Sequence, residues 1–210
     1  MVIHNDNSAG RVGRKYQIIY ADPPWEYKES GSGSRVVKSH YPTMSIQDIK
    51  NLPVDDIADE KSILWLWVTF PRLEQGLEVI KAWGFSYYGL GFDWIKTSSN
   101  GNLSWGMGYY TRQNTEICLI GVKKKPNRFS PLVRNELSAV MSRRLSHSEK
   151  PTIFKDKIVN IIGDVPRIEL FARTKTDGWD CWGNEVDSDI ELMSDVGSPD
   201  APPPSEAIKP

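Results

Sequence analysis

Short apolar runs recur along the chain and are separated by segments with helical spacing. The runs that predict buried strands lie at residues 17–21, 63–68, 85–96, 115–122 and 168–172. Pro71 opens a predicted helix whose apolar positions continue to Trp83, and Gly84 ends it. Because strands alternate with helices, the pattern predicts an α/β sandwich with a mainly parallel sheet.

Two more helices follow from local signals. Ser45 and Asp48 form a predicted capping box that opens a short helix. A second helix is expected over residues 151–162, where Gly163 ends it. The segments that remain, residues 26–40 and 97–114, are rich in glycine, serine and aromatic residues and are predicted to be loops.

Composition places the chain among globular proteins of ordinary size. It has 210 residues, of which 39% are hydrophobic and 25% charged. No run is long enough to cross a membrane, and the polar start does not resemble a signal peptide. Only Cys118 and Cys181 occur, with no zinc-site spacing, so we expect a reduced intracellular protein without a structural metal.

The charge is unevenly distributed along the chain. The net charge is −1, from 26 basic and 27 acidic residues. Residues 185–210 hold seven of the acids and one of the bases, which leaves residues 1–184 with a net charge of +5. We therefore expect a mildly basic domain over residues 16–186, a flexible segment at 1–15 and a disordered acidic tail at 187–210. The tail is either solvated or competes with polyanions for the basic face.

Four residues after the first strand carry the clearest chemical signal. Asp22, Pro23, Pro24 and Trp25 lie at the carboxyl end of a buried strand, where open α/β sheets bind ligands. The Asp22 carboxylate can accept hydrogen bonds from an exocyclic amine. The two prolines remove N–H donors, so the Pro23 carbonyl is expected to face the same amine without local competition. Trp25 offers a ring for stacking a flipped base, or else fills the core.

The ordered set of motifs resembles the DPPW-type adenine-N6 methyltransferase family, which includes the catalytic subunit of the eukaryotic mRNA adenosine methyltransferase. The motifs that carry the resemblance span about residues 16–186: Asp22 to Trp25, Tyr41 to Met44, Arg112 to Val122, His147 to Pro151, Glu169 to Arg173 and Trp182 to Glu185. The compact form is similar to phage and bacterial members. The resemblance implies transfer of a methyl group from S-adenosylmethionine to the N6 amine of adenine, with no metal.

The resemblance also implies roles for individual residues. The catalytic group comprises Asp22, Pro23, Pro24 and Trp25. The expected cofactor-binding residues are Ala21, Asp22, Lys150, Glu169, Leu170, Phe171, Arg173, Asn184 and Glu185. Lys150 is expected to reach the methionyl carboxylate and Arg173 the ribose hydroxyls. Many family members have a glycine at the position of Ala172, and some have an amide at that of Glu185, so this chain departs from the family there.

Substrate contacts are expected from loops and basic stretches. The candidates are Tyr27, Lys28, Arg35, His40, Tyr41, Arg112, Lys123, Lys124 and Lys125. Three of them belong to a run of seven bases within residues 123–144, which is a candidate phosphate-binding surface or else a solvated turn. The glycine–serine segment before Arg35 suits closure over phosphates, or else is an ordinary flexible loop.

The order of the motifs implies a circularly permuted, Rossmann-like methyltransferase fold, with the catalytic strand before the cofactor strand. Little chain follows Trp182, so the sheet is expected to be trimmed at that edge.

Several functions fit these residues. The preferred one is a DNA adenine-N6 methyltransferase in the cytoplasm of a bacterium or a phage-infected host cell. The alternatives are an RNA adenine methyltransferase and a catalytically silent, nucleic-acid-binding partner subunit. A protein-glutamine methyltransferase fits less well, because those relatives usually carry Asn and Tyr in the tetrapeptide. A homodimer or a partner subunit stays open.

Overall fold

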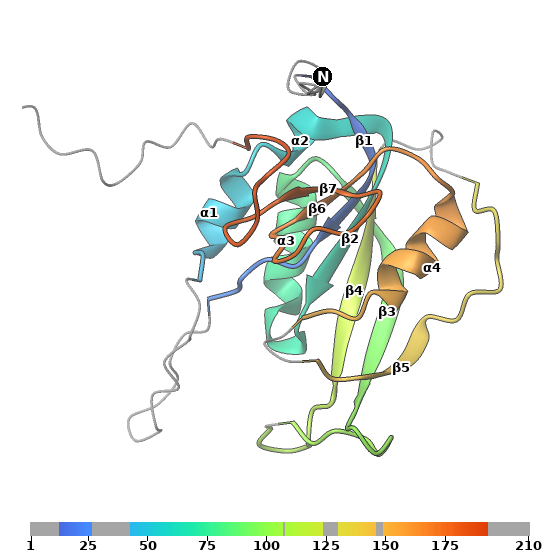
Figure 1. Ribbon diagram of the computed structural model, residues 1–210. Coiled ribbons are helices and arrows are strands. Elements are labelled where there is room, and N and C mark those ends of the chain that lie inside the picture. The colour runs from blue at the N-terminus through green and yellow to red at the C-terminus, as the bar shows by residue number, and fades with distance from the viewer. Residues whose placement is uncertain (1–12, 27–42, 107, 124–129, 146–148, 193–210) are drawn as a thin grey trace, which may run out of the picture.

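The protein is built around one mixed seven-stranded sheet with the strand order β5-β3-β4-β2-β1-β6-β7 (Figure 1). The computed structural model describes residues 13–26, 43–106, 108–123, 130–145 and 149–192. The strands are β1 (Tyr16–Ala21), β2 (Ala58–Val68), β3 (Ser86–Thr97), β4 (Thr115–Val122), β5 (Ala139–Arg143), β6 (Arg167–Leu170) and β7 (Asp180–Trp182). Only β4 runs against its neighbours, so the mainly parallel α/β sheet is confirmed.

Because six of the strands point the same way, their carboxyl ends meet at one edge of the sheet. We call this the carboxyl edge. The antiparallel strand β4 begins there, at Thr115, and ends at the opposite edge, at Val122. Residues at the start of β4 therefore lie near the ends of β1 and β2, whereas Lys123, directly after β4, lies far from them.

Both faces of the central strands are buried, which explains why these strands are apolar without alternation. On β1, Ile19 and Ala21 belong to one core cluster, and Ile18 and Tyr20 belong to the other. Strand β2 divides in the same way: Leu64, Leu66 and Val68 face the first cluster and Ile63, Trp65 and Trp67 face the second. The tryptophans of β2 are therefore core side chains.

Helices cover the two faces of the sheet (Figure 1). On one face lie α1 (Ile46–Asn51), α2 (Val54–Ile57) and α3 (Leu73–Ala82), which contribute to the first cluster. On the other lies α4 (Ile153–Ile162), whose Phe154 and Ile158 contribute to the second. Ser45 caps α1 as expected: its hydroxyl accepts a hydrogen bond from the Asp48 backbone N–H and donates one to the Asp48 carboxylate at 2.7 Å.

Several element boundaries differ from those expected. Strand β5 was not anticipated, and β2 begins at Ala58 rather than at residue 63. Pro71 lies in the 3-10 turn η2 (Phe70–Arg72), so α3 begins only at Leu73. The strand expected over residues 168–172 ends at Leu170, because Phe171 adopts a φ of 62° and turns the chain out of the sheet.

The end of the folded chain also differs from expectation. Leu192 is buried in the first core cluster and Ile190 packs against it, so the fold continues beyond residue 186. Asp189 accepts a hydrogen bond from the Cys181 backbone N–H at 3.0 Å and thereby ties this segment to β7. The rest of the expected tail, residues 193–210, lies outside the described residues. At this edge the described sheet stops at the three-residue strand β7, in line with the expected trimming.

Candidate active site

Asp22 directly follows β1 at the carboxyl edge, and a tight turn holds it there. The Pro23 carbonyl accepts a hydrogen bond from the Trp25 backbone N–H at 2.9 Å, and the Pro24 carbonyl accepts one from Met44 N–H at 3.0 Å. The expectation that the Pro23 carbonyl has no local competitor is therefore wrong, because the N–H two residues later already binds it. A carbonyl oxygen has a second lone pair, and only that one stays available for a ligand.

Trp25 is a core side chain in this structure. Its side chain belongs to the first core cluster with 5% of the residue exposed, and its indole N–H donates to the Trp67 carbonyl at 3.1 Å. Of the two interpretations of Trp25, core filling is therefore the one observed, and the ring offers no open face for stacking. The buried ring anchors the turn to β2, which fixes the position of Asp22 three residues earlier.

Asp22 does not stand alone but pairs with Lys150. The Lys150 ammonium lies 2.6 Å from Asp22 Oδ2 and 3.2 Å from Glu116 Oε2. It also lies 5.4 Å from the centroid of the Trp67 ring, within cation–π range. Glu116 in turn pairs with Lys96 on β3. The side chains therefore alternate in charge across the carboxyl edge, from Lys96 through Glu116 and Lys150 to Asp22.

The surroundings shift the pKa values of these groups in different directions. Burial raises the pKa of Asp22, and Lys150 opposes that shift without cancelling it. Burial alone would raise the pKa of Glu116, but the two lysines beside it outweigh burial and lower it. For Lys150, burial would lower the pKa, yet the two carboxylates outweigh it and raise it. Lys150 therefore stays positively charged at neutral pH, and Glu116 stays negatively charged.

Most of the expected cofactor residues line one pocket beside Asp22. Its volume is about 140 Å³, and its walls are Asp22, Pro24, Met44, Phe171, Ala172, Arg173, Trp182, Gly183, Asn184 and Glu185. The Phe171 and Trp182 rings lie 5.4 Å apart at 72°, which gives the pocket an aromatic side. Arg173 and Glu185 lie 3.7 Å apart and give it a polar one. We call this the Phe171 pocket.

The other expected cofactor residues lie elsewhere. Ala21 and Leu170 are fully buried in the first core cluster and do not line the Phe171 pocket. The Glu169 side chain lies on the other face of β6, where it pairs with the buried Lys155, which also donates to the Thr176 hydroxyl at 2.7 Å. Glu169 and Leu170 are neighbours along β6, and side chains of neighbouring strand residues point to opposite faces of the sheet.

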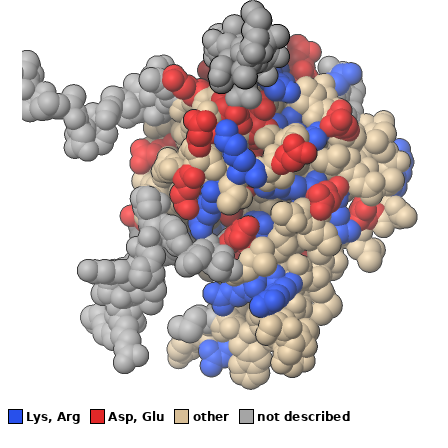
Figure 2. Space-filling view, viewed as in Figure 1, with Lys and Arg blue, Asp and Glu red and all other residues tan. Residues whose placement is uncertain are grey.

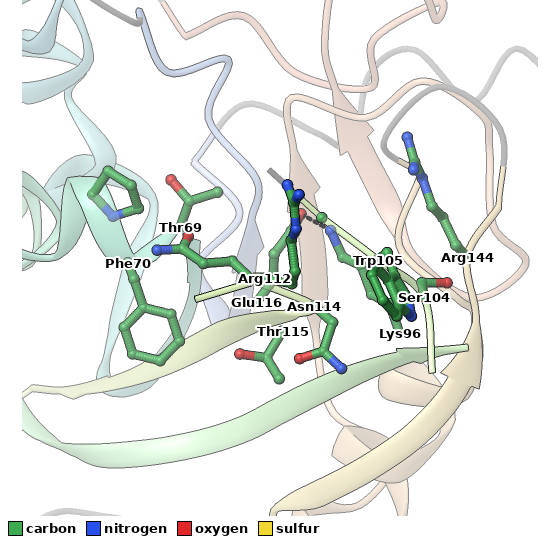
Figure 3. Close-up of a pocket in the computed structure, with 13 residues that line it drawn as sticks. Thr69, Phe70, Lys96, Ser104, Trp105, Arg112, Asn114, Thr115, Glu116 and Arg144 are labelled. Atoms are coloured by element: carbon green, nitrogen blue, oxygen red, sulfur yellow. Dashed lines mark hydrogen bonds and ion pairs between the residues drawn. The ribbon is translucent and has the colours of Figure 1, made fainter. Parts of the chain in front are cut away.

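A second pocket, of about 530 Å³, opens beside Glu116 (Figure 3). We call it the Arg112 pocket. Its lining comes from the end of β2, the end of β3, the start of β4 and the loops next to them: Thr69, Phe70, Pro71, Lys96, Ser104, Trp105, Gly106, Arg112, Gln113, Asn114, Thr115, Glu116 and Arg144. Arg112 lies in the middle of the lining residues and Arg144 at one side (Figure 3), and the Trp105 residue is 81% exposed. Cations and an exposed aromatic ring therefore surround a hollow that reaches Glu116.

Of the two expected substrate residues that the structure describes, one is not brought to this edge. Lys123 follows β4 at the opposite edge, about 25 Å along the strand from Glu116, and pairs there with Asp55. Lys124, Lys125, Tyr27, Lys28, Arg35, His40 and Tyr41 lie outside the described residues. Arg112 is the one expected substrate residue of the described part that lies at the pocket.

Sequence reasoning gave no role to Lys96 and did not pair Glu116 with Lys150. The signal available was weak: Lys96 comes near the end of a strand and Glu116 near the start of the next. An antiparallel turn between these strands would have placed the two side chains together. Nothing local indicates that Lys150, 34 positions further on, joins them.

The described residues contain neither a metal-binding cluster nor a membrane-spanning helix. No group of three or more His, Cys, Asp or Glu side chains in that part of the chain could hold a metal ion. No helix among the same residues is long and apolar enough to cross a bilayer.

Comparison with known proteins places these features in a family. The MT-A70 family matches residues 16–185, which include β1 to β7 and both pockets. The chain is 33% identical over 198 residues to the type II methyltransferase M.MunI of Mycoplasma sp, covering 85% of this chain and 82% of that protein. It is 27% identical over 186 residues to the human N(6)-adenosine-methyltransferase catalytic subunit METTL3, covering 87% of this chain but 30% of that longer protein. Mouse METTL4, an N(6)-adenine-specific methyltransferase, is 27% identical over 185 residues, with 83% and 38% covered. The match over most of the folded chain shows that this protein belongs to the MT-A70 family.

Proposed function

We propose that the protein transfers a methyl group from S-adenosylmethionine to the exocyclic N6 amine of adenine in nucleic acid, with DNA as the preferred polymer. The observation that carries the proposal is the place of Asp22 between two pockets. Asp22 itself lines the Phe171 pocket, and Lys150 links it to Glu116 in the wall of the Arg112 pocket. A donor and an acceptor in separate pockets would therefore meet at one carboxylate.

The Phe171 pocket suits the adenosine part of the cofactor. Its aromatic side can contact an adenine ring, and Arg173, Asn184 and Glu185 can bind ribose hydroxyls or ring nitrogens. The backbone there is unusually close-packed: a Cβ at Gly183 would lie 2.2 Å from the Ala172 carbonyl oxygen. Phe171 holds a φ of 62°, a conformation that costs roughly 1 kcal/mol or more and is enriched at ligand sites. Both features fit a preorganised binding pocket.

The Arg112 pocket suits the acceptor nucleotide. Its guanidinium groups can bind phosphates flanking the target, and Trp105 can stack on a neighbouring base. A base inside a duplex cannot reach Asp22, so the target would have to leave the stack. We place the acceptor base in the Arg112 pocket beside Glu116, with its amine directed to the Asp22 oxygen that does not bind Lys150.

S-adenosylmethionine supplies an electrophilic methyl group on a sulfonium. In the transfer, the N6–methyl bond forms as the sulfur–methyl bond breaks, and the electron pair stays on sulfur. The adenine amine is a poor nucleophile, because its lone pair is delocalised into the ring. Asp22 accepts a hydrogen bond from this amine, and the free lone pair of the Pro23 carbonyl can accept another. These bonds localise the pair and hold the nitrogen in line, and after the methyl group arrives the proton would pass from the nitrogen to Asp22 or to water.

The strand order is consistent with a circularly permuted methyltransferase sheet. Asp22 follows the first strand of the chain, and the aromatic pocket follows β6 and β7, the last two. We propose that β6 takes the place of the strand that opens an ordinary Rossmann-like methyltransferase.

The choice of DNA rests on the compact relative. The chain and the type II methyltransferase each cover more than four fifths of the other, whereas the N(6)-adenosine-methyltransferase relatives are much longer. Those longer relatives make RNA the second candidate substrate.

The test is methyl transfer from radiolabelled S-adenosylmethionine to unmodified duplex DNA, single-stranded DNA and RNA, followed by digestion to nucleosides. We expect label in N6-methyldeoxyadenosine from DNA. Asp22→Ala should reduce the rate by at least about a hundredfold with the fold intact, because it removes the acceptor of the amine hydrogen bond. Glu78→Gln, which breaks an exposed ion pair with Lys50, is the matched control and should leave the rate unchanged.

Other outcomes would change the assignment. Label only in RNA would move the substrate to the second candidate. Appreciable residual transfer by Asp22→Ala would reject the role of Asp22. No label in any substrate, together with no S-adenosylmethionine binding by calorimetry, would favour the silent partner subunit.

A further inference from the structure

The charged chain at the carboxyl edge has a member that touches neither Asp22 nor the Phe171 pocket. Lys96 lies at the end of β3 and contacts Glu116 Oε1, while Glu116 Oε2 contacts Lys150 at 3.2 Å. Each oxygen of the Glu116 carboxylate therefore holds one lysine. Lys150 completes the chain at 2.6 Å from Asp22 Oδ2. The Glu116 carboxylate, through Lys150, thus links β3 to the turn after β1.

The chain lies in surroundings that exclude most water. The Lys150 side chain is 7% exposed, that of Glu116 14% and that of Lys96 20%. In such surroundings, an ion pair depends strongly on each partner, since removal of one leaves an uncompensated charge. Without Lys96, one oxygen of the Glu116 carboxylate would lose the positive charge that compensates it.

Two tryptophan rings fix where the ammonium groups can lie. Lys96 Nζ is 5.0 Å from the Trp94 ring centroid, and Lys150 Nζ is 5.4 Å from that of Trp67. The two rings contact each other, with centroids 6.3 Å apart at 80°, and both residues are 1% exposed. Each ammonium is therefore attracted to a buried ring that cannot move without disturbing the core. Glu116 therefore bridges two ammonium groups, and the buried tryptophan rings determine where each of these groups lies.

We propose that Lys96 is a positioning residue for methyl transfer. It holds Glu116 Oε1, so that Oε2 holds Lys150 against Asp22 Oδ2 and Asp22 Oδ1 is left for the acceptor amine. Lys96 acts through Glu116 and makes no contact with the reacting atoms. The effect of Lys96 on catalysis rests on the proposed function. The ion pairs that join Lys96 to Asp22 through Glu116 and Lys150 do not depend on it.

The competing role for Lys96 is a direct substrate contact, because Lys96 also lines the Arg112 pocket. The two roles predict different kinetics. A positioning residue affects kcat, since the geometry at Asp22 matters in the transition state, whereas a phosphate contact affects KM and the salt dependence of binding.

The first test compares Lys96→Met, Lys96→Arg and the wild type in the methyl-transfer assay. We expect Lys96→Met to lower kcat about tenfold or more with KM within about twofold, and Lys96→Arg to recover most of the loss. Lys50→Met, which breaks an exposed pair on α1, is the matched control and should leave both constants unchanged. An unchanged kcat with a raised KM and a smaller salt slope would overturn the proposal.

A double-mutant cycle covers the case in which Lys96→Met folds poorly. Glu116→Gln removes the group through which Lys96 is proposed to act, and the double variant leaves no unbalanced charge between them. Lys96→Met should therefore add little to the loss of kcat already caused by Glu116→Gln. Multiplicative losses would mean that the two residues act separately, which would overturn the proposal.

A readout without activity separates this proposal from the proposed function. The charged groups around Glu116 are Lys96, Lys150 and Asp22, and Arg112 and Arg144 line the same pocket. Carbon-13 NMR titration of the Glu116 carboxyl should show its pKa below the ordinary range in the wild type and higher in Lys96→Met. If the pKa of Glu116 shifts in this way but the protein methylates no substrate, the proposed function fails, while the coupling of Lys96 to Glu116 is confirmed. The same pKa in both proteins would reject the linkage.

Discussion

At the scale of single residues, the site depends on the Lys150 ammonium, which contacts the carboxylates of both Asp22 and Glu116. Asp22 is the group that would accept the amine, and one of its oxygens already binds a buried ammonium. Burial raises the pKa of Asp22 and Lys150 opposes the shift, while Glu116 adds to it. The carboxylate is therefore harder to ionise than an ordinary aspartate, although the adjacent cation opposes part of the effect of burial.

This balance predicts the acid limb of the pH–rate profile. Asp22 accepts a strong, charge-assisted hydrogen bond only when ionised, so kcat/KM should fall as the pH drops through its raised pKa, at a pH above the ordinary aspartate value of about 3.9. In Lys150→Met the opposing cation is lost, so the limb should move to still higher pH while the maximal rate falls. Profiles of kcat/KM against pH for the two proteins measure both effects. A wild-type limb at or below the ordinary value would contradict the prediction.

At the scale of elements, α3 approaches β2 closely through a glycine. A Cβ at Gly76 would lie 2.6 Å from Val68 Cγ1. Val68 is 1% exposed and its β-branched side chain has little freedom at χ1, so it cannot move aside cheaply. Helix α3 can therefore pack this closely against β2 only because Gly76 has no side chain. The residues directly after β2 line the Arg112 pocket.

Gly76→Ala should therefore destabilise the protein, against the usual trend for a helix interior. Alanine gains about 1 kcal/mol of helix propensity, but overpacking of a buried contact costs about 1–3 kcal/mol. We expect a net loss of up to about 2 kcal/mol in the free energy of unfolding, measured by denaturant titration. Adding Val68→Ala should make the same glycine substitution stabilising, because the clash is removed. A stabilising Gly76→Ala in the wild-type background would contradict this packing.

The elements themselves were largely predictable. Long apolar runs predicted β1, β2, β3 and β4, because strands buried on both faces must be apolar throughout. The short strand β5 was missed, since its five residues are half exposed and carry no such run. The end of β6 was misplaced, because the left-handed turn at Phe171 is imposed by its tertiary surroundings rather than by a glycine.

At the scale of the whole molecule, charge is distributed in a way that bears on nucleic-acid binding. In Figure 2, positive and negative side chains are mixed over the upper part of the face shown, whereas the lower part carries positive groups without negative neighbours. The loop between β3 and β4 lies at the lower end in the same view (Figure 1). Arg112 and Arg144 lie at the Arg112 pocket, while Lys123 is neutralised by Asp55 at the opposite edge.

The salt dependence of binding should therefore respond to the arginines and not to Lys123. Arg112→Gln and Arg144→Gln should each reduce the slope of log K against log salt by about 1 and weaken binding of all sequences similarly. Lys123→Gln, the matched control, should leave the slope unchanged. Fluorescence anisotropy with a labelled oligonucleotide over a salt series measures all three. The reverse pattern would place the phosphate-binding surface at the end of β4, as the run of bases alone had indicated.

The sequence by itself determined the parts of this protein that depend on local residue order. The apolar runs specified the central strands, and the residues after β1, β6 and β7 specified Asp22, Phe171, Arg173 and Asn184. The strand before Asp22 placed that residue at the ligand-binding edge, whereas Phe171, Arg173 and Asn184 were grouped with it by the resemblance of their motifs, because β7 was not predicted.

The tertiary structure alone decided the rest. The direction of β4 sends Glu116 to the carboxyl edge and Lys123 to the opposite one. Packing against β2 buries Trp25, and the pairing of Lys150 with both Asp22 and Glu116 joins residues 128 and 34 positions apart. Contacts of this range arise from how strands and helices are stacked, and no local pattern of polar and apolar positions encodes them.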